Sequence, residues 1–184
     1  MGYVAKTKAE SRKLIVSLGL NRVPEIFLEK TDSRGMREFF ETYPSALYVL
    51  RDAEHSSSQY FYVTNAEECI EKAALFSGKV ILAVSTNGYK NKVLLGAIEI
   101  CGDLVRIVAT QDETLDHRTM YGRAEYSWET KVTDKRLSNI PEIDYLFDYL
   151  YRNKLLDITV EFTIYDRPVG VNQERMVINE LRNY

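Results

Sequence analysis

The spacing of hydrophobic and polar residues along the chain predicts helices and strands in an irregular order. The clearest helix falls within residues 140–155, where apolar side chains recur at intervals of three and four residues and so line one face. Asn65, followed three residues later by Glu68, has the form of a capping box at the start of another helix. Further helices are expected over residues 7–18 and from Asp32 or Ser33 to about Tyr43.

Strands are indicated by short apolar or alternating runs between polar turns. In residues 157–165, Ile158, Val160 and Phe162 alternate with polar side chains, so one face of this strand is expected in the core. Cys101–Asp103 is typical of a tight turn between two strands. The remaining strands are expected at residues 46–51, 60–63, 80–85, 93–100, 104–110, 126–132 and 176–180. Strands that occur in groups, with helices irregularly between them, favour an α+β fold of mostly antiparallel sheets with packed helices.

The length of 184 residues fits one domain with a sizeable core. Within it we assign residues 1–44 to an N-terminal helical segment and residues 45–184 to the α+β core, and whether the first segment joins the core is left open. Residues 112–121 have no clear pattern, although a short helix fits them. No linker rich in proline, glycine or serine divides the chain.

Charge and composition narrow the classes of partner. The 24 basic and 27 acidic residues give a net charge of −3, without the clustered positive charge that phosphate backbones attract, so nucleic-acid binding is not indicated. The sequence has neither an apolar run of the roughly 18 residues that span a membrane nor an N-terminal secretory signal. We therefore expect a soluble, cytoplasmic protein in which Cys69 and Cys101 are reduced.

The 13 tyrosines are numerous for a chain of this length. Most are expected in the core or at half-buried strand positions, but tyrosine is also enriched at protein interfaces. A homo-oligomer or a protein partner is therefore the alternative interpretation of this composition.

Arg51 ends a predicted strand and is the first candidate for ligand binding. The polar loop after it carries Ser56, Ser57 and Ser58. A guanidinium group, serine hydroxyls and backbone N–H groups together suit a phosphate group. In the structural alternative, Arg51 pairs with Asp52 or Glu54 and the serines form an ordinary loop.

Glu161 and Glu180 form the second candidate site, because they lie on the two C-terminal strands. If these strands are neighbours, the two carboxylates lie side by side, and Asn183 can add a carbonyl oxygen. Such oxygen ligands suit Mg²⁺, which is commonly held by one or two carboxylates together with nucleotide phosphates. The alternative is a solvated polar face on which Glu180 pairs with Arg182 or Arg175.

Other catalytic arrangements find little support in the sequence. The two histidines are His55 and His117, and the run Asp116–Arg118 is more typical of mutually satisfied side chains at the start of a helix. No serine or cysteine stands in a nucleophile-elbow context, and neither the P-loop nor the Rossmann fingerprint is present. Catalytic residues therefore stay unassigned.

In their order along the chain, these elements resemble the ATP-grasp domain. Tyr48–Arg51, the serines that follow, and Tyr60–Val63 are similar to the nucleotide-binding start of the pyruvate phosphate dikinase and phosphoenolpyruvate synthase branch. Val160–Phe162 with Val177–Glu180 resembles the metal-binding end of the family. The resemblance covers about residues 45–184.

This resemblance implies that Mg²⁺ and ATP are cofactors and that Arg51 contacts phosphate. Adenine would pack against a hinge at residues 81–85, to which Leu82 and Val84 belong. The implied chemistry is activation of a carboxylate as an acyl phosphate, or another phosphoryl transfer, stabilised mainly by metal and arginine charges.

The resemblance also implies that Glu161 and Glu180 hold Mg²⁺. The closing motif of the family has an asparagine two residues after the second glutamate, whereas this chain has Arg182 there. The alternative function is a binding or regulatory module that keeps the fold, lacks catalysis, and associates with itself or with a protein partner.

Overall fold

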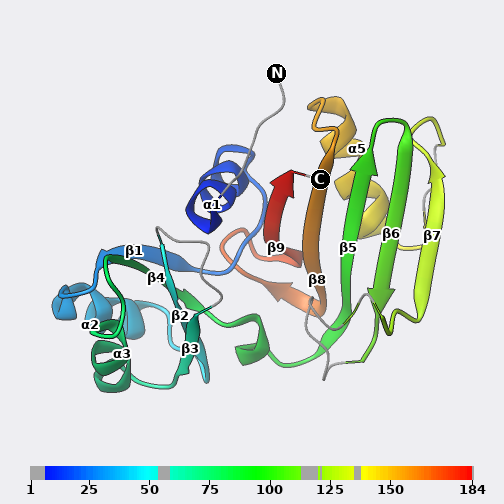
Figure 1. Cartoon of the computed structure of the whole chain (residues 1–184). Helices are drawn as coiled ribbons and strands as arrows, with labels where there is room; N and C mark the ends of the chain where they lie inside the picture. Colours follow the sequence, from blue (N-terminus) through cyan, green and yellow to red (C-terminus); the bar gives the residue numbers. More distant parts are fainter. Residues whose placement is uncertain (1–6, 54–58, 113–119, 121, 135–137, 184) are drawn as a thin grey trace.

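The computed structural model describes residues 7–53, 59–112, 120, 122–134 and 138–183, and it has two lobes, each built on its own antiparallel sheet (Figure 1). The sheet of the small lobe contains, in spatial order, β1 (Glu25–Glu29), β4 (Lys79–Val84), β2 (Tyr48–Asp52) and β3 (Tyr60–Val63). The sheet of the large lobe contains β7 (Tyr126–Lys131), β6 (Leu104–Thr110), β5 (Lys92–Cys101), β8 (Ile158–Val169) and β9 (Glu174–Asn183). The α+β architecture predicted from the sequence is confirmed.

Helices α2 (Ser33–Thr42) and α3 (Ala66–Ala73) cover one face of the small sheet (Figure 1). The predicted N-caps are present: the side chain of Asp32 accepts a hydrogen bond from the N–H of Gly35 at the start of α2, and that of Asn65 accepts one from the N–H of Glu68 at the start of α3. The side chain of Glu68 accepts from the N–H of Thr64, so only half of the predicted capping box forms. Tyr48 of β2 points toward these helices, because its ring lies 4.1 Å from that of Phe40 between centroids. The small-lobe core thus lies between β2 and the two helices.

Helix α5 (Pro141–Arg152) lies on one face of the large sheet, and α1 (Lys8–Ser17) lies beside the edge strand β9 (Figure 1). The regular spacing of apolar residues along α5 explains its position, because this spacing gives the helix one buried stripe. The stripe consists of Ile143, Leu146, Phe147 and Leu150. Leu14 and Ile15 of α1 belong to the same hydrophobic core.

The described part of the segment 1–44, which the sequence assigned to a helical segment, contributes to both lobes. Residues 25–29 form the edge strand β1, which is paired with β4 and was not predicted as a strand from the sequence. Helix α2 packs in the small lobe, whereas α1 packs in the large one. The local pattern did not separate these roles, because β1 pairs with a strand that follows it by fifty or more residues. Residues 112–121, the possible short helix, lie almost entirely outside the described residues.

Both cysteines are free thiols, as expected. Cys69 is buried in the small-lobe core, and burial raises its pKa to about 12, whereas Cys101 is exposed at the end of β5. Among the described residues, no helix has both the length and the apolar character needed to cross a membrane.

Tyr165 lies on β8 in the large lobe and contacts the connection between β4 and β5, which contains η1 (Thr86–Gly88). It thereby joins the two lobes. Its hydroxyl donates a hydrogen bond of 2.9 Å to the carbonyl of Thr86, and its ring packs edge-on against Tyr89 at 5.5 Å between centroids. Burial raises the pKa of Tyr165, so the hydroxyl stays protonated and remains a donor. Tyr165 and Val177 belong to the same hydrophobic cluster as the small-lobe core, so the large sheet completes that core.

Asn21 anchors the segment between α1 and β1 to the β8–β9 hairpin. Its side-chain nitrogen lies 3.0 Å from the carbonyl oxygen of Val169 and 2.8 Å from that of Met176. Its Oδ1 accepts a hydrogen bond of 2.9 Å from the N–H of Asn172. Only 2% of Asn21 is exposed, so these bonds satisfy an amide that burial would otherwise destabilise.

Gly170 makes this close contact possible. It has a φ of +78°, and a Cβ at this position would lie 2.6 Å from Oδ1 of Asn21 and 2.7 Å from the carbonyl oxygen of Arg22. Gly102 has a similar φ of +61°, but nothing lies within 4 Å of a Cβ built there. Comparing an alanine substitution at Gly170 with one at Gly102 therefore separates the cost of backbone strain from the cost of a steric clash.

We expect Gly170→Ala to destabilise the protein more than Gly102→Ala. Each substitution places alanine in the left-handed region at a cost of about 1 kcal/mol, and only Gly170→Ala adds a clash with backbone, for a total of about 3 kcal/mol. Urea unfolding monitored by circular dichroism measures both losses. Equal losses would contradict the close approach of Asn21.

We expect Tyr165→Phe to lower the free energy of unfolding by about 1 kcal/mol, because the Thr86 carbonyl loses its donor. Tyr145→Phe is the matched control: Tyr145 lies on α5 and is 71% exposed. The control should change stability by less than about 0.5 kcal/mol. Equal values for the two variants in urea unfolding would mean that the hydroxyl of Tyr165 does not contribute to the junction.

Candidate functional site

One face of β8 turns away from α5 and toward the small lobe. Val160 and Phe162 lie in the core beneath α5, so the alternation of the strand places Thr159, Glu161 and Thr163 on the opposite face. Further along the same face, Tyr165 packs into the small-lobe core. On this face of β8, the polar side chains of residues 159–163 therefore lie next to the part of the strand that packs against the small lobe.

Strands β8 and β9 pair so that Glu161 stands directly opposite Glu180, as expected if the C-terminal strands are neighbours. A bulge produces this register: Phe162 pairs with Ile178, and Asn179 is the extra residue of β9. Without the bulge, Glu180 would share the core face with Ile178. The bulge instead turns Glu180 to the face that carries Glu161.

Each of the two carboxylates is paired with a basic side chain. Nη2 of Arg182 lies 3.1 Å from Oε1 of Glu161, and its Nη1 lies 3.6 Å from Oε1 of Glu180. Nζ of Lys8, at the start of α1, lies 2.6 Å from Oε2 of Glu180. We call Glu161, Glu180, Lys8 and Arg182 the acid–base cluster. Its acids are the more buried members: the Glu161 side chain is 11% exposed and the Arg182 side chain 43%.

The pKa values of two cluster members are lowered, that of Lys8 mainly by burial and that of Glu180 by neighbouring charges. Burial lowers the pKa of Lys8, and the charges of Arg51 and Arg12 lower it further, against the attraction of Glu180. Burial alone would raise the pKa of Glu180, but Lys8, Arg182 and Arg12 outweigh burial and bring the pKa below its usual value. The shift of Lys8 is therefore caused mainly by burial, whereas that of Glu180 is caused by the basic side chains around it.

Arg51 lies near this cluster from the other lobe, since its charge acts on Lys8. It lies on β2 one residue after Leu50, which is fully buried in the small-lobe core, so its side chain leaves the opposite face of the small sheet. On that face it shares a row with Tyr60 and Ile81, and its guanidinium carbon lies 5.7 Å from the centroid of the Tyr60 ring. The arginine predicted to bind phosphate and the two predicted acids therefore lie around one junction.

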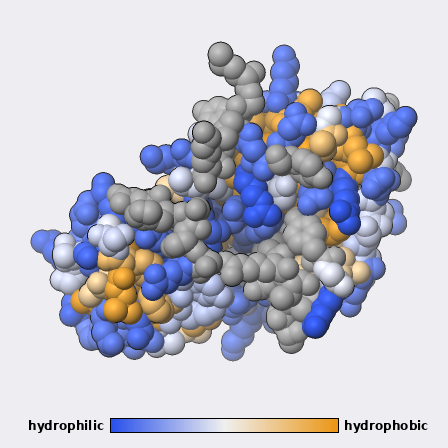
Figure 2. All heavy atoms as spheres, in the orientation of Figure 1, coloured by the Kyte–Doolittle hydropathy of each residue, from blue (hydrophilic) through white to orange (hydrophobic). Residues whose placement is uncertain are grey.

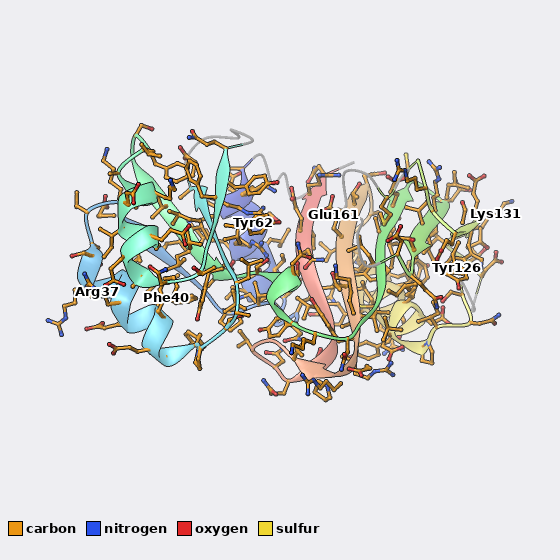
Figure 3. The ribbon with its side chains drawn as sticks, turned by 90° about the horizontal axis from the view of Figure 1, so that it is seen from below. Arg37, Phe40, Tyr62, Tyr126, Lys131 and Glu161 are labelled. Atoms are coloured by element: carbon orange, nitrogen blue, oxygen red, sulfur yellow. The ribbon has the colours of Figure 1, made fainter. Side chains whose placement is uncertain are left out.

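The figures show how this junction is placed. In Figure 3, Tyr62 of the small lobe and Glu161 of the large lobe lie on the inner sides of their lobes, whereas Arg37 on α2 lies at the outer end. Figure 2 shows hydrophilic residues beside the region between the lobes, where grey atoms do not cover the surface, and a hydrophobic patch on the small lobe.

Three predicted site residues do not face the acid–base cluster. Asn183 follows Arg182 in the regular part of β9, so it lies on the opposite face from Glu180. Leu82 and Val84 pair with Leu50 and Tyr48, and they therefore point toward α2 and α3. On the inner face of β4 the side chains are instead those of Ile81 and Ala83.

The predicted phosphate loop, Ser56, Ser57 and Ser58, and both histidines, His55 and His117, lie outside the described residues.

A pocket of about 440 Å³ opens beside the connection from β4 to β5. The described residues that line it are Asn87, Tyr89, Lys90, Asn91 and Lys92. The side-chain amide of Asn87 donates to the hydroxyl of Tyr62 at 3.4 Å, and its Oδ1 accepts from Lys92 at 3.1 Å. The hinge side of the junction is therefore polar and partly open.

The acids do not form a ready site for Mg²⁺. A magnesium ion needs near-octahedral oxygen ligands, and the carbonyl of Asn183 is turned away from the two carboxylates. The carboxylates are already engaged by Arg182 and Lys8. Within the described residues, no group of three or more His, Cys, Asp or Glu side chains is placed to hold a metal. As arranged here, the donor set fits two cations of the protein itself better than a metal ion.

Sequence reasoning found part of this arrangement. The pairing of Glu180 with Arg182 was the stated alternative and is present, whereas Arg175 pairs with Glu142 instead. Lys8 was missed because it lies 172 residues from Glu180 along the chain. No local signal in the sequence connects two residues so far apart, and only the docking of α1 against β9 brings them together.

No protein-family model and no curated protein matches the sequence. Solved structures resemble the fold, however. D-Alanyl-alanine synthetase A of Vibrio cholerae superposes with a TM-score of 0.57 at 15% identity, over 96% of this chain and 55% of that protein. The N5-carboxyaminoimidazole synthase of Aspergillus clavatus, in complex with ADP and 5-aminoimidazole ribonucleotide, superposes with a TM-score of 0.57 at 13% identity, over 96% of this chain and 44% of that protein.

The ATP-grasp ligase PsnB, complexed with a minimal precursor, gives a TM-score of 0.53 at 13% identity, over 95% of this chain and 51% of that protein. The chain thus spans about half of the length of these structures. At such identities the likeness concerns the fold, and it gives no support to the narrower resemblance to the pyruvate phosphate dikinase branch. The chain thus has an α+β fold similar to that of part of these structures, among them an ATP-grasp ligase.

Proposed function

We propose that this chain binds ATP at the junction of its two lobes and serves in an ATP-dependent ligase or phosphotransferase reaction. The observation that carries the proposal is the placement of Arg51 from the small lobe beside a charged cluster from the large lobe, within an ATP-grasp-like fold. A similar structure was determined with ADP bound, which supports a nucleotide as the ligand. The acceptor of the phosphoryl group is not assigned.

The proposed binding mode follows from the inner faces of the two sheets. The guanidinium of Arg51 offers a planar set of N–H donors that suits phosphate oxygens, with Ser56, Ser57 and Ser58 as candidates from the loop that follows. The adenine ring would lie against the inner face of β4 near Ile81 and Ala83, while Leu82 and Val84 support that strand from the core. The polar hinge pocket beside Tyr89 continues from this strand.

In the proposed reaction, Mg²⁺ would supply charge neutralisation for the transferred phosphoryl group when it arrives with ATP. Glu161 and Glu180 are the carboxylates nearest to that role, but their pairing with Arg182 and Lys8 does not fit a resident ion. What the chain itself contributes is positive charge from Arg51, Lys8 and Arg182, which binds and orients the polyphosphate.

A second candidate function is a nucleotide-binding or regulatory module without catalysis. The ion pairs of both carboxylates favour this alternative, because they occupy the groups that would otherwise hold a catalytic metal. Exposed tyrosines offer a surface for a protein partner or a second copy, among them Tyr43, Tyr60, Tyr62, Tyr145 and Tyr151. Release of ADP from ATP distinguishes the two functions, since a binding module leaves ATP intact.

We expect Arg51→Met to weaken ATP binding by about tenfold or more, because one charge-assisted phosphate contact is lost while the aliphatic stem is kept. Isothermal titration with ATP, with and without Mg²⁺, gives the dissociation constant. Arg37→Met is the matched control, since Arg37 lies on the outer helix α2 and pairs with Glu67 there. The control should bind like the wild type. Failure of the wild type to bind ATP under either condition would refute the proposed function.

A further inference from the structure

We propose that Lys8 and Arg182 take the place of a divalent cation at Glu161 and Glu180, so that this site binds the polyphosphate of a nucleotide without Mg²⁺. The inference rests on the proposed nucleotide site and states which charges serve it. It assigns a binding role to two basic residues, one from the start of α1 and one from the end of β9.

The geometry of the acid–base cluster is the first argument. Two carboxylates directly opposite each other on neighbouring strands repel, so the pair of Glu161 and Glu180 requires a cation. Arg182 meets this requirement with a fork that reaches both acids, with N–O distances of 3.1 Å to Glu161 and 3.6 Å to Glu180. Lys8 adds a second positive charge 2.6 Å from Glu180. The pair is therefore neutralised within the protein.

The charges around the cluster are the second argument. Arg51 and Arg12 both lower the pKa of Lys8, so both lie close enough to act on it. Arg12 also pairs with Glu25, at 3.2 Å. Lys8, Arg12, Arg51 and Arg182 thus lie at or near the two acids of the cluster, while Arg12 and Arg22 also share Glu25. This concentration of basic side chains favours a polyanion over a magnesium ion.

Burial strengthens this preference. The side chains of Glu161 and Glu180 are only 11% and 18% exposed, so a metal would have to displace basic partners that stabilise largely desolvated carboxylates. Mg²⁺ also gives up its water reluctantly. The acids accordingly act as positioning residues that hold the basic side chains at the junction.

The basic partners remain accessible to a ligand. The side chain of Arg182 is 43% exposed and that of Lys8 is 30% exposed, so a ligand can reach part of each side chain. A guanidinium and an ammonium group are the two side-chain types that bind phosphate directly. The chemistry that this surface recognises is therefore a run of phosphate groups, as in a nucleoside triphosphate.

The first test measures metal affinity without any nucleotide. Arg182→Asn removes the shared cation and adds a neutral oxygen, so we expect MgCl₂ alone to raise the melting temperature of this variant by several degrees. The same salt should leave the melting temperature of the wild type unchanged. Arg152→Asn is the matched control, because Arg152 is exposed on α5 and pairs only locally with Asp148 among the described residues. It should behave as the wild type does.

The second test measures ATP binding by isothermal titration in EDTA and in excess MgCl₂. For the wild type and for Arg152→Asn, we expect dissociation constants that agree within about threefold between the two conditions. For Arg182→Asn, we expect binding in EDTA to weaken by about tenfold or more and to recover when Mg²⁺ is supplied. Recovery by Mg²⁺ would also show that this variant is folded and has an intact nucleotide site.

The outcomes separate this inference from the proposed function. Wild-type binding of ATP that requires Mg²⁺, or a wild-type melting temperature that rises with MgCl₂ as that of Arg182→Asn does, overturns the inference and leaves the nucleotide site standing. Unchanged ATP binding by Arg182→Asn in EDTA also overturns it. No binding of ATP by the wild type in either condition refutes both.

Discussion

Strand β8 is buried on both faces, and this constraint determines the arrangement of the rest of the molecule. On one face, Val160 and Phe162 form the core beneath α5, whereas Tyr165 on the other face completes the core of the small lobe. A strand that contributes to two cores cannot shift its register without exposing apolar residues to water. The two lobes are therefore held by the same strand that carries the acidic side chain of the candidate site.

The double burial of β8 also explains why the acid–base cluster lies where it does. Between the two packed regions, the inner face carries Glu161, which is close to the small lobe without being covered by its apolar core. The bulge at Asn179 then brings Glu180 onto the same face. Placing two acids in a partly buried junction is unfavourable unless cations accompany them, and Arg182 and Lys8 supply that charge.

Buried hydrogen bonds hold the two lobes together at the junction, and charged side chains lie beside these bonds. Asn21 and Tyr165 bind the lobes together by hydrogen bonds that are largely shielded from water. Arg51 then approaches the acid–base cluster from the opposite sheet, where its charge acts on Lys8. Donors held in place before a ligand arrives lose less entropy on binding, which suits recognition of a polyphosphate. The ATP-grasp-like fold brings the two sheets together at the junction, and the charged side chains of this chain determine which ligand the junction suits.

The sequence by itself determined the α+β class, most helices and strands, and the candidate acids, because hydrophobic periodicity and capping residues act over a few neighbouring positions. Strands 60–63 and 104–110 and the caps at Asp32 and Asn65 are examples. Only the tertiary structure decided the rest. The pairing of β1 and the ion pair of Lys8 depend on residues far apart in the chain, and one bulge residue reverses the face of Glu180 relative to simple alternation. The sequence determines which side chains carry a charge, but the packing of distant elements determines which partner neutralises each charge.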